Sequence, residues 1–227
     1  MQIGYGQVQV SQKCKSTILG YLEAMEKVAT PSSDQVYYMN YKTETVFYES
    51  YNIPVTSTKT DMMMGDKKIV MEDENMKIYG DEKNVFVVLP KVRKIYWNNS
   101  DPRLFAANNS YKKFLDIERS LLESAEVISC SSVQNQNDRI TIIPAKAFTE
   151  ETGLVRQILE YDKTQKRVIR VENSFNKKSK IKKQIVYYSV LDYNSKKNIK
   201  EPLTYIFDGT NLKSSFKDFE IIDNRKK

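Results

Sequence analysis

The spacing of apolar and polar residues predicts that most of this chain forms β-strands. Across residues 37–47, aromatic, apolar and threonine side chains alternate with polar ones, which is the two-residue period of a strand with one buried face. Segments of similar character recur along the rest of the chain, at 68–72, 75–79, 84–89, 92–97, 127–133, 139–144, 154–161, 167–175, 184–193, 203–207 and 216–222. Most of their connectors are only a few residues long, so neighbouring strands are expected to pair antiparallel.

Two other segments have the period of an amphipathic α-helix. The first, residues 10–29, has Ser11 as its expected N-cap and is followed by Pro31, which stops it. Its apolar positions recur at steps of three and four, at Cys14, Ile18, Tyr21, Leu22, Met25 and Val28. The second, residues 111–125, has an apolar stripe at Phe114, Ile117, Leu121 and Leu122. Asp101-Pro102 predicts a short helical turn before it.

These elements predict an α+β fold. A sheet of about eleven strands curls or closes on itself, and two helices from different parts of the chain can then cover one face of it. We therefore expect a strongly curved antiparallel sheet, or an unclosed β-barrel, with the two main helices on its concave face. Neither a linker nor an internal repeat interrupts the pattern, so residues 1–227 are expected to form a single domain.

The composition excludes much enzyme chemistry. The chain has no histidine, which removes histidine general bases, Ser-His-Asp triads and zinc sites that contain histidine. None of its 7 glycines forms a dinucleotide or P-loop phosphate motif. The carboxylates near the central strands, such as Asp61, Asp66 and Glu72 to Glu74, fall mostly at turns, where they are solvated. We therefore predict a protein that is not an enzyme, with no catalytic residue, no metal and no cofactor.

The net charge of +7 comes largely from clustered lysines. They crowd residues 177–183 and 196–200, where hairpin turns are expected, and the chain ends in Arg225, Lys226 and Lys227. Lysine at turns and edges also opposes strand-to-strand aggregation. Basic and aromatic residues do not interleave along one strand, as they do in nucleic-acid readers, so no nucleic-acid partner is predicted. The longest apolar run, Val85 to Leu89, is far too short to span a bilayer.

Cys14 and Cys130 are the only cysteines. Two interpretations stay open: they form a disulfide, which requires that the protein is exported, or they are two small buried apolar residues. Residues 1–7 leave the same question open: Gly4, Gly6 and Gln7 resemble the last positions of a signal peptide, but an added start methionine or an ordinary cytosolic start gives the same sequence.

A stripe of aromatic, methionine and aliphatic side chains is the candidate binding site. Methionine and tyrosine adapt to irregular apolar ligands. The candidate residues are Tyr37, Met39, Tyr41, Ile69, Met71, Met76, Ile78, Val85 and Val87. They either line a surface for an apolar ligand or pack as ordinary core beneath the two helices.

The order of elements resembles the LolA-like periplasmic lipoprotein carriers over nearly the whole chain. Residues 78–95 are similar to that family's turn, short strand, proline and basic strand, and 140–144, 154–162 and 168–173 are similar to its later strands. The family usually has Asp-Gly in the central turn, where this chain has Asp81-Glu82, and an arginine in an early strand, whereas no arginine precedes Arg93.

The resemblance implies an unclosed barrel lidded by helices, with an apolar cavity for lipoprotein acyl chains. We therefore expect a periplasmic protein, exported after removal of a signal peptide, that carries or senses a lipid or lipoprotein acyl chain and has an envelope protein as a further partner. The alternative is a cell-envelope scaffold module whose barrel is filled by its own side chains.

Overall fold

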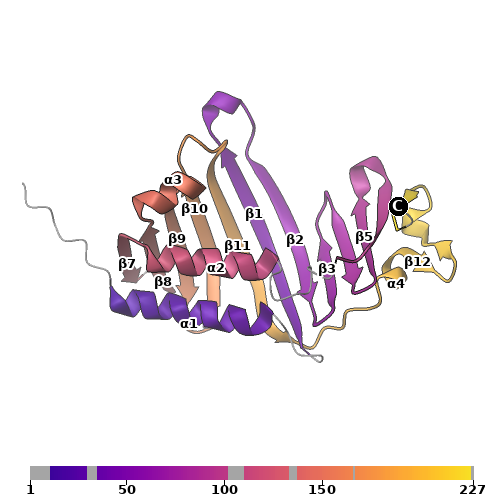
Figure 1. Cartoon of the computed structure of the whole chain (residues 1–227), viewed down its shortest axis with the longest axis horizontal. Helices are drawn as coiled ribbons and strands as arrows, with labels where there is room; N and C mark the ends of the chain where they lie inside the picture. The colour runs from indigo at the N-terminus through magenta and orange to yellow at the C-terminus, as the bar shows by residue number, and fades with distance from the viewer. Residues whose placement is uncertain (1–10, 30–34, 102–109, 133–136, 166, 226–227) are drawn as a thin grey trace, which may run out of the picture. The chain divides into compact units, whose positions relative to one another are not determined.

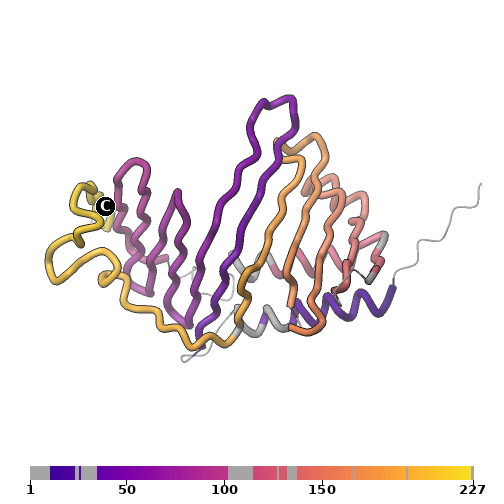
Figure 2. The backbone as a smooth tube through the Cα atoms, turned by 180° about the vertical axis from the view of Figure 1, so that it is seen from behind, coloured from indigo at the N-terminus to yellow at the C-terminus, as the bar shows by residue number. Residues whose placement is uncertain are grey.

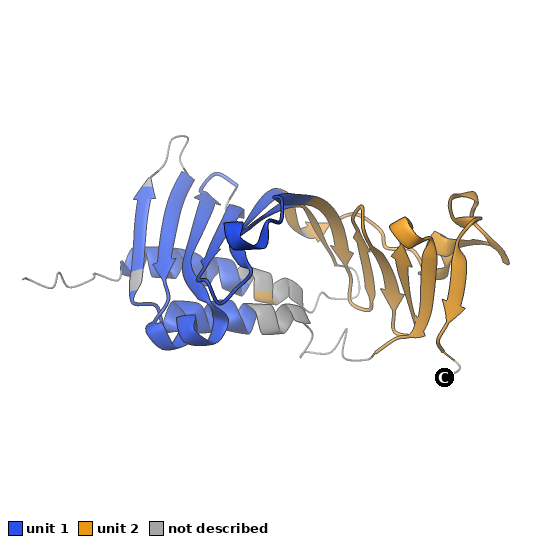
Figure 3. Ribbon diagram, turned by 90° about the horizontal axis from the view of Figure 1, so that it is seen from above, with its two compact units in different colours: residues 1–24, 43–57, 115–188 blue, residues 25–42, 58–114, 189–227 orange. Residues whose placement is uncertain are grey.

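The computed structural model describes residues 11–29, 35–101, 110–132, 137–165 and 167–225 (Figure 1). The chain divides into two compact units (Figure 3). Unit 1 comprises residues 1–24, 43–57 and 115–188, and unit 2 comprises residues 25–42, 58–114 and 189–227. The helical turn predicted to start at Asp101-Pro102 lies, from Pro102 onward, outside the described residues, and so do the N-terminal residues 1–7.

The strands follow one hydrogen-bonded order, β14-β6-β5-β4-β3-β2-β1-β11-β10-β9-β8-β7. In the described part of the chain, β7 and β14 are the two edges of this sheet, so it is unclosed, as predicted. Three long strands contain residues of both units: β1 (Val36–Phe47), β2 (Thr56–Met64) and β11 (Ile181–Ser195). The predicted α+β class with a large antiparallel sheet is confirmed.

Unit 1 holds the strands at one end of this order, and each pairs antiparallel with its neighbour along the chain. They are β7 (Val127–Ser132), β8 (Asn137–Ile143), β9 (Leu154–Asp162), β10 (Arg167–Phe175) and the first part of β11. The helices α1 (Gln12–Ala29) and α2 (Ser110–Glu123) lie on the same side of these strands (Figure 1). A short helix, α3 (Lys146–Thr152), connects β8 and β9.

The two faces of the unit 1 strands have opposite character. Ile128, Ile140, Ile142 and Leu159 are buried on the face toward the helices, and register pairs Ile128 with Ile142 and Ile140 with Leu159. The helices on this side also bury side chains, namely Cys14, Ile18, Leu22, Leu115, Leu121 and Leu122. The other face carries ion pairs. This division of faces is the physical basis of the two-residue period in the sequence.

The ion pairs on the outer face of unit 1 link four strands. Arg139 of β8 pairs with Glu160 of β9 at 2.9 Å, and Arg170 of β10 approaches the same Glu160 carboxylate at 3.3 Å. Arg170 also pairs with Glu172 of its own strand, which Lys183 of β11 approaches at 2.8 Å. Burial raises the pKa of Glu172, but Lys183 and Arg170 outweigh this effect, so its pKa lies below the usual value.

Unit 2 contains the strands at the other end of the order. They are β3 (Lys68–Glu72), β4 (Lys77–Asp81), β5 (Asn84–Leu89), β6 (Lys94–Asn99) and β14 (Glu220–Asp223), with most of β2. The chain end folds over them through α4 (Leu203–Ile206), the small hairpin of β12 (Phe207–Asp208) and β13 (Asn211–Leu212), and the 3₁₀ turn η5 (Ser214–Phe216). The 3₁₀ turn η2 (Pro90–Val92) joins β5 to β6.

One face of the unit 2 strands forms a closed core with the C-terminal segment. Val70, Tyr79, Phe86, Val88 and Ile95 of the strands pack with buried residues of that segment. The segment contributes Ile199, Ile206 and Phe216. Tyr79 also stacks on Tyr205, with ring centroids 4.5 Å apart. We refer to this side of the strands as the C-terminal core face.

Three predictions about the chain end and the pairing are wrong. Residues 203–207 were expected as a strand, but Leu203–Ile206 form α4 and only Phe207 belongs to a strand, β12. The reason is that Pro202 begins a helical turn that buries Ile206. Residues 216–222 are a strand only from Glu220, since Phe216 belongs to η5 and is buried in the core. The strand β14 runs parallel to β6, whereas all pairing was expected to be antiparallel.

Three further details differ from the prediction. The strand β2 and the helix α3 were not predicted. In β2, residues 56–61 are mostly polar and Met62 to Met64 are all apolar, so the strand shows no alternation of apolar and polar residues. In α2 the stripe is rotated, because Leu115 is buried and Ile117 is 52% exposed. The expected N-cap is confirmed, since Ser11 Oγ accepts a hydrogen bond from the Cys14 amide at 3.4 Å.

Candidate functional site

The strand registers place the central candidate residues on one face of unit 2. Met71 pairs with Ile78, and Ile78 pairs with Val87, across β3, β4 and β5. One step along the strands, Ile69 pairs with Gly80, and Gly80 with Val85. Directly paired residues of an antiparallel ladder project from the same face. Ile69, Met71, Ile78, Val85 and Val87 therefore share the face opposite to the C-terminal core face.

The register adds residues that sequence reasoning missed. Met62 of β2 pairs with Met71, and Tyr96 of β6 pairs with Val87, so both extend the same row. Met62 was missed because β2 lacks alternation, while Tyr96 depends on the register across the β5–β6 turn. We call this surface the apolar face and define it by Met62, Ile69, Met71, Ile78, Val85, Val87 and Tyr96.

Contacts of β1 with β2 bring the first three candidates to the same side. Tyr38 and Asn40 donate hydrogen bonds to Asp61, at 2.7 and 2.8 Å, on the side opposite to Met62. Burial raises the pKa of Tyr41, and a hydrogen bond with Thr60 partly opposes this rise. Because Thr60 and Met62 project from one side of β2, and Tyr41 alternates with Asn40, Tyr41 lies on the side of the apolar face. By the same alternation along β1, Tyr37 and Met39 lie on this side too.

The candidate residues differ in how far they are already buried. Tyr37 is fully buried, and its hydroxyl donates to Met39 Sδ at 2.8 Å. Val85 is buried as well, whereas Ile69, Met71, Ile78 and Val87 are half-buried. On the C-terminal core face, by contrast, Phe86, Val88 and Ile95 are 0% exposed. The apolar face thus keeps accessible apolar surface along β3 to β5.

Met76 lies at the edge of this surface. It precedes β4 and closes the β3–β4 turn, in which the Asp73 carboxylate accepts hydrogen bonds from the Asn75 and Met76 amides at 2.7 Å. Its side chain is half-buried. Alternation places it on the side of Ile78, but it belongs to the turn rather than to the paired rows.

Cys14 and Cys130 form a disulfide that ties α1 to β7. Their Cα atoms are 5.8 Å apart, which is an ordinary separation for a bridge. The Ser11 amide also donates to the Ile128 carbonyl at 3.0 Å, so the start of α1 is held at the same strand. The two cysteines are 116 residues apart in sequence, and the bridge therefore closes a long loop.

A half-buried acid of α2, Glu118, contacts the sheet of unit 1. The Gln157 side-chain amide donates to Glu118 Oε1 at 3.0 Å, and Gln157 is 1% exposed. Burial raises the pKa of Glu118 to about 7, although the hydrogen bond from Gln157 acts in the opposite direction. Gln157 Oε1 is buried, and among the described residues it has no hydrogen-bond partner. A protonated Glu118 can donate to an acceptor of this kind, whereas an ionised one cannot.

The pH dependence of stability is expected to follow from Glu118. Its pKa rises from 4.5 to about 7 on folding, so the folded state holds the proton more tightly. The contribution of Glu118 to the free energy of unfolding is fully present below its unfolded pKa of 4.5. It is lost as pH rises from there to the folded pKa of about 7, and the total loss is about 3 kcal/mol at most. Urea unfolding at pH 5 and pH 8 measures it, and Glu118→Gln, which stays neutral, should remove much of the decrease. Identical pH profiles for both proteins would exclude Glu118 as the cause.

In the described part of the chain, no helix is long and apolar enough to cross a membrane. In the same part of the chain, no three cysteine, aspartate or glutamate side chains are arranged so that they could hold a metal ion together.

No protein-family model and no curated protein matches the chain. Solved structures similar to it include an uncharacterized conserved protein from Thermus thermophilus, at 9% identity and a TM-score of 0.45, covering 92% of this chain and 99% of that one. The lipoprotein LppX from Mycobacterium tuberculosis is 12% identical with a TM-score of 0.44, covering 84% and 100%. A LolA superfamily protein from Nitrosomonas europaea is 8% identical with a TM-score of 0.32, covering 78% and 93%. The family that the sequence resembles is thus represented among these structures.

Proposed function

We propose that this protein is a non-enzymatic carrier or sensor that binds the acyl chain of a lipid or lipoprotein on its apolar face. The observation that carries the proposal is the paired row Met62, Met71, Ile78 and Val87, which is half-buried on a sheet whose opposite face already packs a core. A continuous, partly accessible apolar row on such a sheet is the kind of surface that an extended hydrocarbon chain covers.

The chemistry of the apolar face suits a hydrocarbon ligand. Burying an acyl chain contributes about 0.8 kcal/mol for each CH₂ removed from water, so several methylenes give useful affinity without any polar recognition. The methionines Met62 and Met71 are flexible and polarisable, which lets them follow an irregular or mobile chain. Tyr96 at the end of the row adds an aromatic body with a polar tip, and such a residue suits the end of the site near a headgroup.

The Cys14–Cys130 disulfide supports the part of the proposal that concerns location. Such bonds persist in oxidising compartments, which include the bacterial periplasm. We propose that the protein acts there after export. The assignment of residues 1–7 to a signal-peptide remnant stays a prediction.

A second function is favoured by a specific observation. Tyr37, Met39 and Val85 lie on the side of the apolar face and are already buried, with exposed fractions of 0%, 8% and 8%. Part of this side is therefore filled by the protein itself. A cell-envelope scaffold module, which binds a partner protein and no lipid, accounts for that burial.

Titration with a fluorescent fatty acid, followed by displacement with unlabelled fatty acids of increasing length, distinguishes the two functions. The carrier is expected to bind the probe, and each added methylene should strengthen displacement about fourfold until the site is filled. Absence of probe binding, or displacement that does not depend on chain length, would overturn the proposal in favour of the scaffold.

A further inference from the structure

Two hairpin tips of unit 1 lie side by side (Figures 1 and 2). One is the β1–β2 connection, residues 48–55, which includes the 3₁₀ turn η1 (Glu49–Tyr51). The other is the β10–β11 turn, residues 176–180. The Tyr48 amide donates to the Lys180 carbonyl at 3.1 Å, and the Tyr48 hydroxyl donates to the Phe175 carbonyl. We call the joined pair the tip.

Hydrogen bonds also fix the shape of each hairpin at the tip. Asn52 adopts the left-handed conformation, with φ of 48°, and its amide donates to the Glu49 carbonyl, which ends η1. In the second hairpin, the Lys178 amide donates to Asn176 Oδ1 at 3.0 Å, and the Ile181 amide donates to Ser179 Oγ at 3.0 Å. The side chains of the tip are therefore presented from a defined backbone.

The tip concentrates exposed apolar side chains. Tyr51, Ile53 and Val55 are 41%, 42% and 62% exposed. Among the described residues, only three other large apolar side chains are exposed to a comparable degree, and they lie on other elements: Val92, Ile117 and Leu203. Three such residues within five positions of one connection form an exposed apolar cluster. Apolar residues scattered singly over a surface are ordinary, whereas such a cluster indicates an interaction site.

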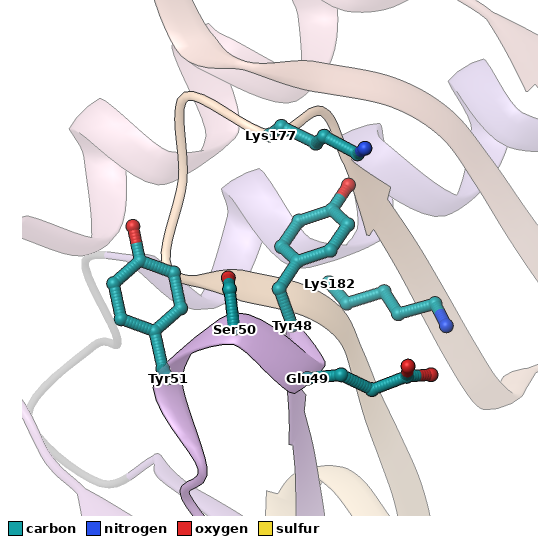
Figure 4. Close-up of a pocket in the computed structure, with 6 residues that line it drawn as sticks. All are labelled: Tyr48, Glu49, Ser50, Tyr51, Lys177 and Lys182. Atoms are coloured by element: carbon teal, nitrogen blue, oxygen red, sulfur yellow. The ribbon is translucent and has the colours of Figure 1, made fainter.

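The same tip is strongly basic. Lys177, Lys178, Lys180 and Lys182 are exposed in or beside the β10–β11 turn. Lys177 and Lys182 line a surface pocket together with Tyr48, Glu49, Ser50 and Tyr51, so the basic and apolar groups adjoin one another (Figure 4). Lys180 Nζ lies 5.9 Å from the centroid of the Tyr51 ring. Lys183 belongs elsewhere, because it pairs with Glu172 on the outer sheet face.

We propose that this tip docks on the surface of a bilayer that contains anionic phospholipid. The lysines are drawn to the negative headgroups, Ile53 and Val55 enter the boundary between headgroups and acyl chains, and Tyr51 lies at the interface, where its apolar ring and polar hydroxyl both find partners. A lysine can keep its ammonium group at the headgroups while its stem follows the apolar residues inward. This contact goes beyond acyl-chain binding, since it concerns where the protein acts and uses different residues.

Charge and exposure together favour a lipid surface over a soluble acidic partner. The four exposed lysines outnumber the one carboxylate that lines the pocket, Glu49, and this excess complements an anionic surface. An acidic protein would satisfy the lysines but would not by itself account for the projecting Ile53 and Val55. A bilayer interface accepts both groups at once.

Vesicle flotation tests the docking of the full chain. Wild-type protein is expected to float with phosphatidylcholine vesicles that contain phosphatidylglycerol, to float far less with phosphatidylcholine alone, and to be released by high salt. The variant Val55→Asp removes the most exposed apolar contact, and the double variant Lys177→Glu/Lys178→Glu reverses two charges. Each should weaken partitioning at least about tenfold, since a basic residue near an anionic surface contributes about fivefold.

Matched controls come from the η2 turn of unit 2. Val92→Asp and Lys91→Glu change an exposed valine and an exposed lysine away from the tip, and both should leave flotation unchanged. All four variants should keep wild-type binding of a fluorescent fatty acid, which separates docking from the proposed acyl-chain site and reports that they are folded. Flotation of the tip variants at the wild-type level overturns the proposal. So does capture of an acidic peptide by the lysines without any flotation, since the partner would then be a protein.

Discussion

Replacing Met71 with Asp is expected to weaken binding of a fluorescent fatty acid by at least about a hundredfold. The substitution places a carboxylate in the middle of the apolar row, and burying an unpaired charge against hydrocarbon is strongly unfavourable, by several kcal/mol. Ile78→Asp should have the same effect, because Ile78 pairs directly with Met71. Both side chains are only half-buried, so the folded state should tolerate the change. Probe titration gives the affinity, and circular dichroism gives the fold.

Two control variants separate the position of the charge from its presence. Met71→Leu keeps an apolar side chain of similar volume and should bind the probe within a few-fold of wild type. Val92→Asp introduces the same charge at an exposed turn of the same unit and should have no effect. If Met71→Asp binds as tightly as wild type, the acyl chain does not lie on the apolar face.

Removing the disulfide is expected to lower the free energy of unfolding substantially. Cross-linking two residues 116 positions apart restricts the unfolded chain, and the chain-entropy model gives about 4–5 kcal/mol for a loop of this length. The variant Cys14→Ser/Cys130→Ser should therefore unfold at a lower urea concentration than wild type. Measured values for native bridges span about 2–5 kcal/mol.

A reducing agent provides the control for this experiment. It should lower the stability of the wild-type protein by about the same amount as the double substitution, and it should not affect the double variant. Equal stabilities of the oxidised wild type and the double variant would contradict the expected role of the bridge. Loss of stability on reduction would also fit the proposed oxidising compartment.

The alternation of side chains was sufficient to predict much of the sheet. Wherever one face packs and the other is solvated, as along β9 with Leu159 inside and Glu160 in an ion pair outside, the two-residue period is clear. The period fails where tertiary packing decides the structure. The run Met62 to Met64 has apolar side chains on both sides, since Met62 lies on the apolar face and Met63 packs against the C-terminal core.

The candidate site was predictable within each strand but not between strands. Alternation alone indicates that Ile69 and Met71 lie on one side of their strand, and that Val85 and Val87 lie on one side of theirs. Which sides meet across strands depends on the register, and here short turns such as the Asp73 turn fix it. The Glu118–Gln157 contact joins residues 39 positions apart, and the Tyr48–Phe175 contact of the tip joins residues more than 100 positions apart, so no local pattern predicts either of them.

Methyl NMR of the eight methionines with a spin-labelled fatty acid tests most directly whether the apolar face holds the acyl chain. Met62 and Met71 pair on that face, whereas Met63 packs against the C-terminal core on the opposite one. The bound spin label is expected to broaden the Met62 and Met71 methyl signals much more strongly than the Met63 signal, because Met63 lies on the far side of the sheet. Equal broadening of Met62 and Met63, or no broadening of either, would contradict binding at the apolar face.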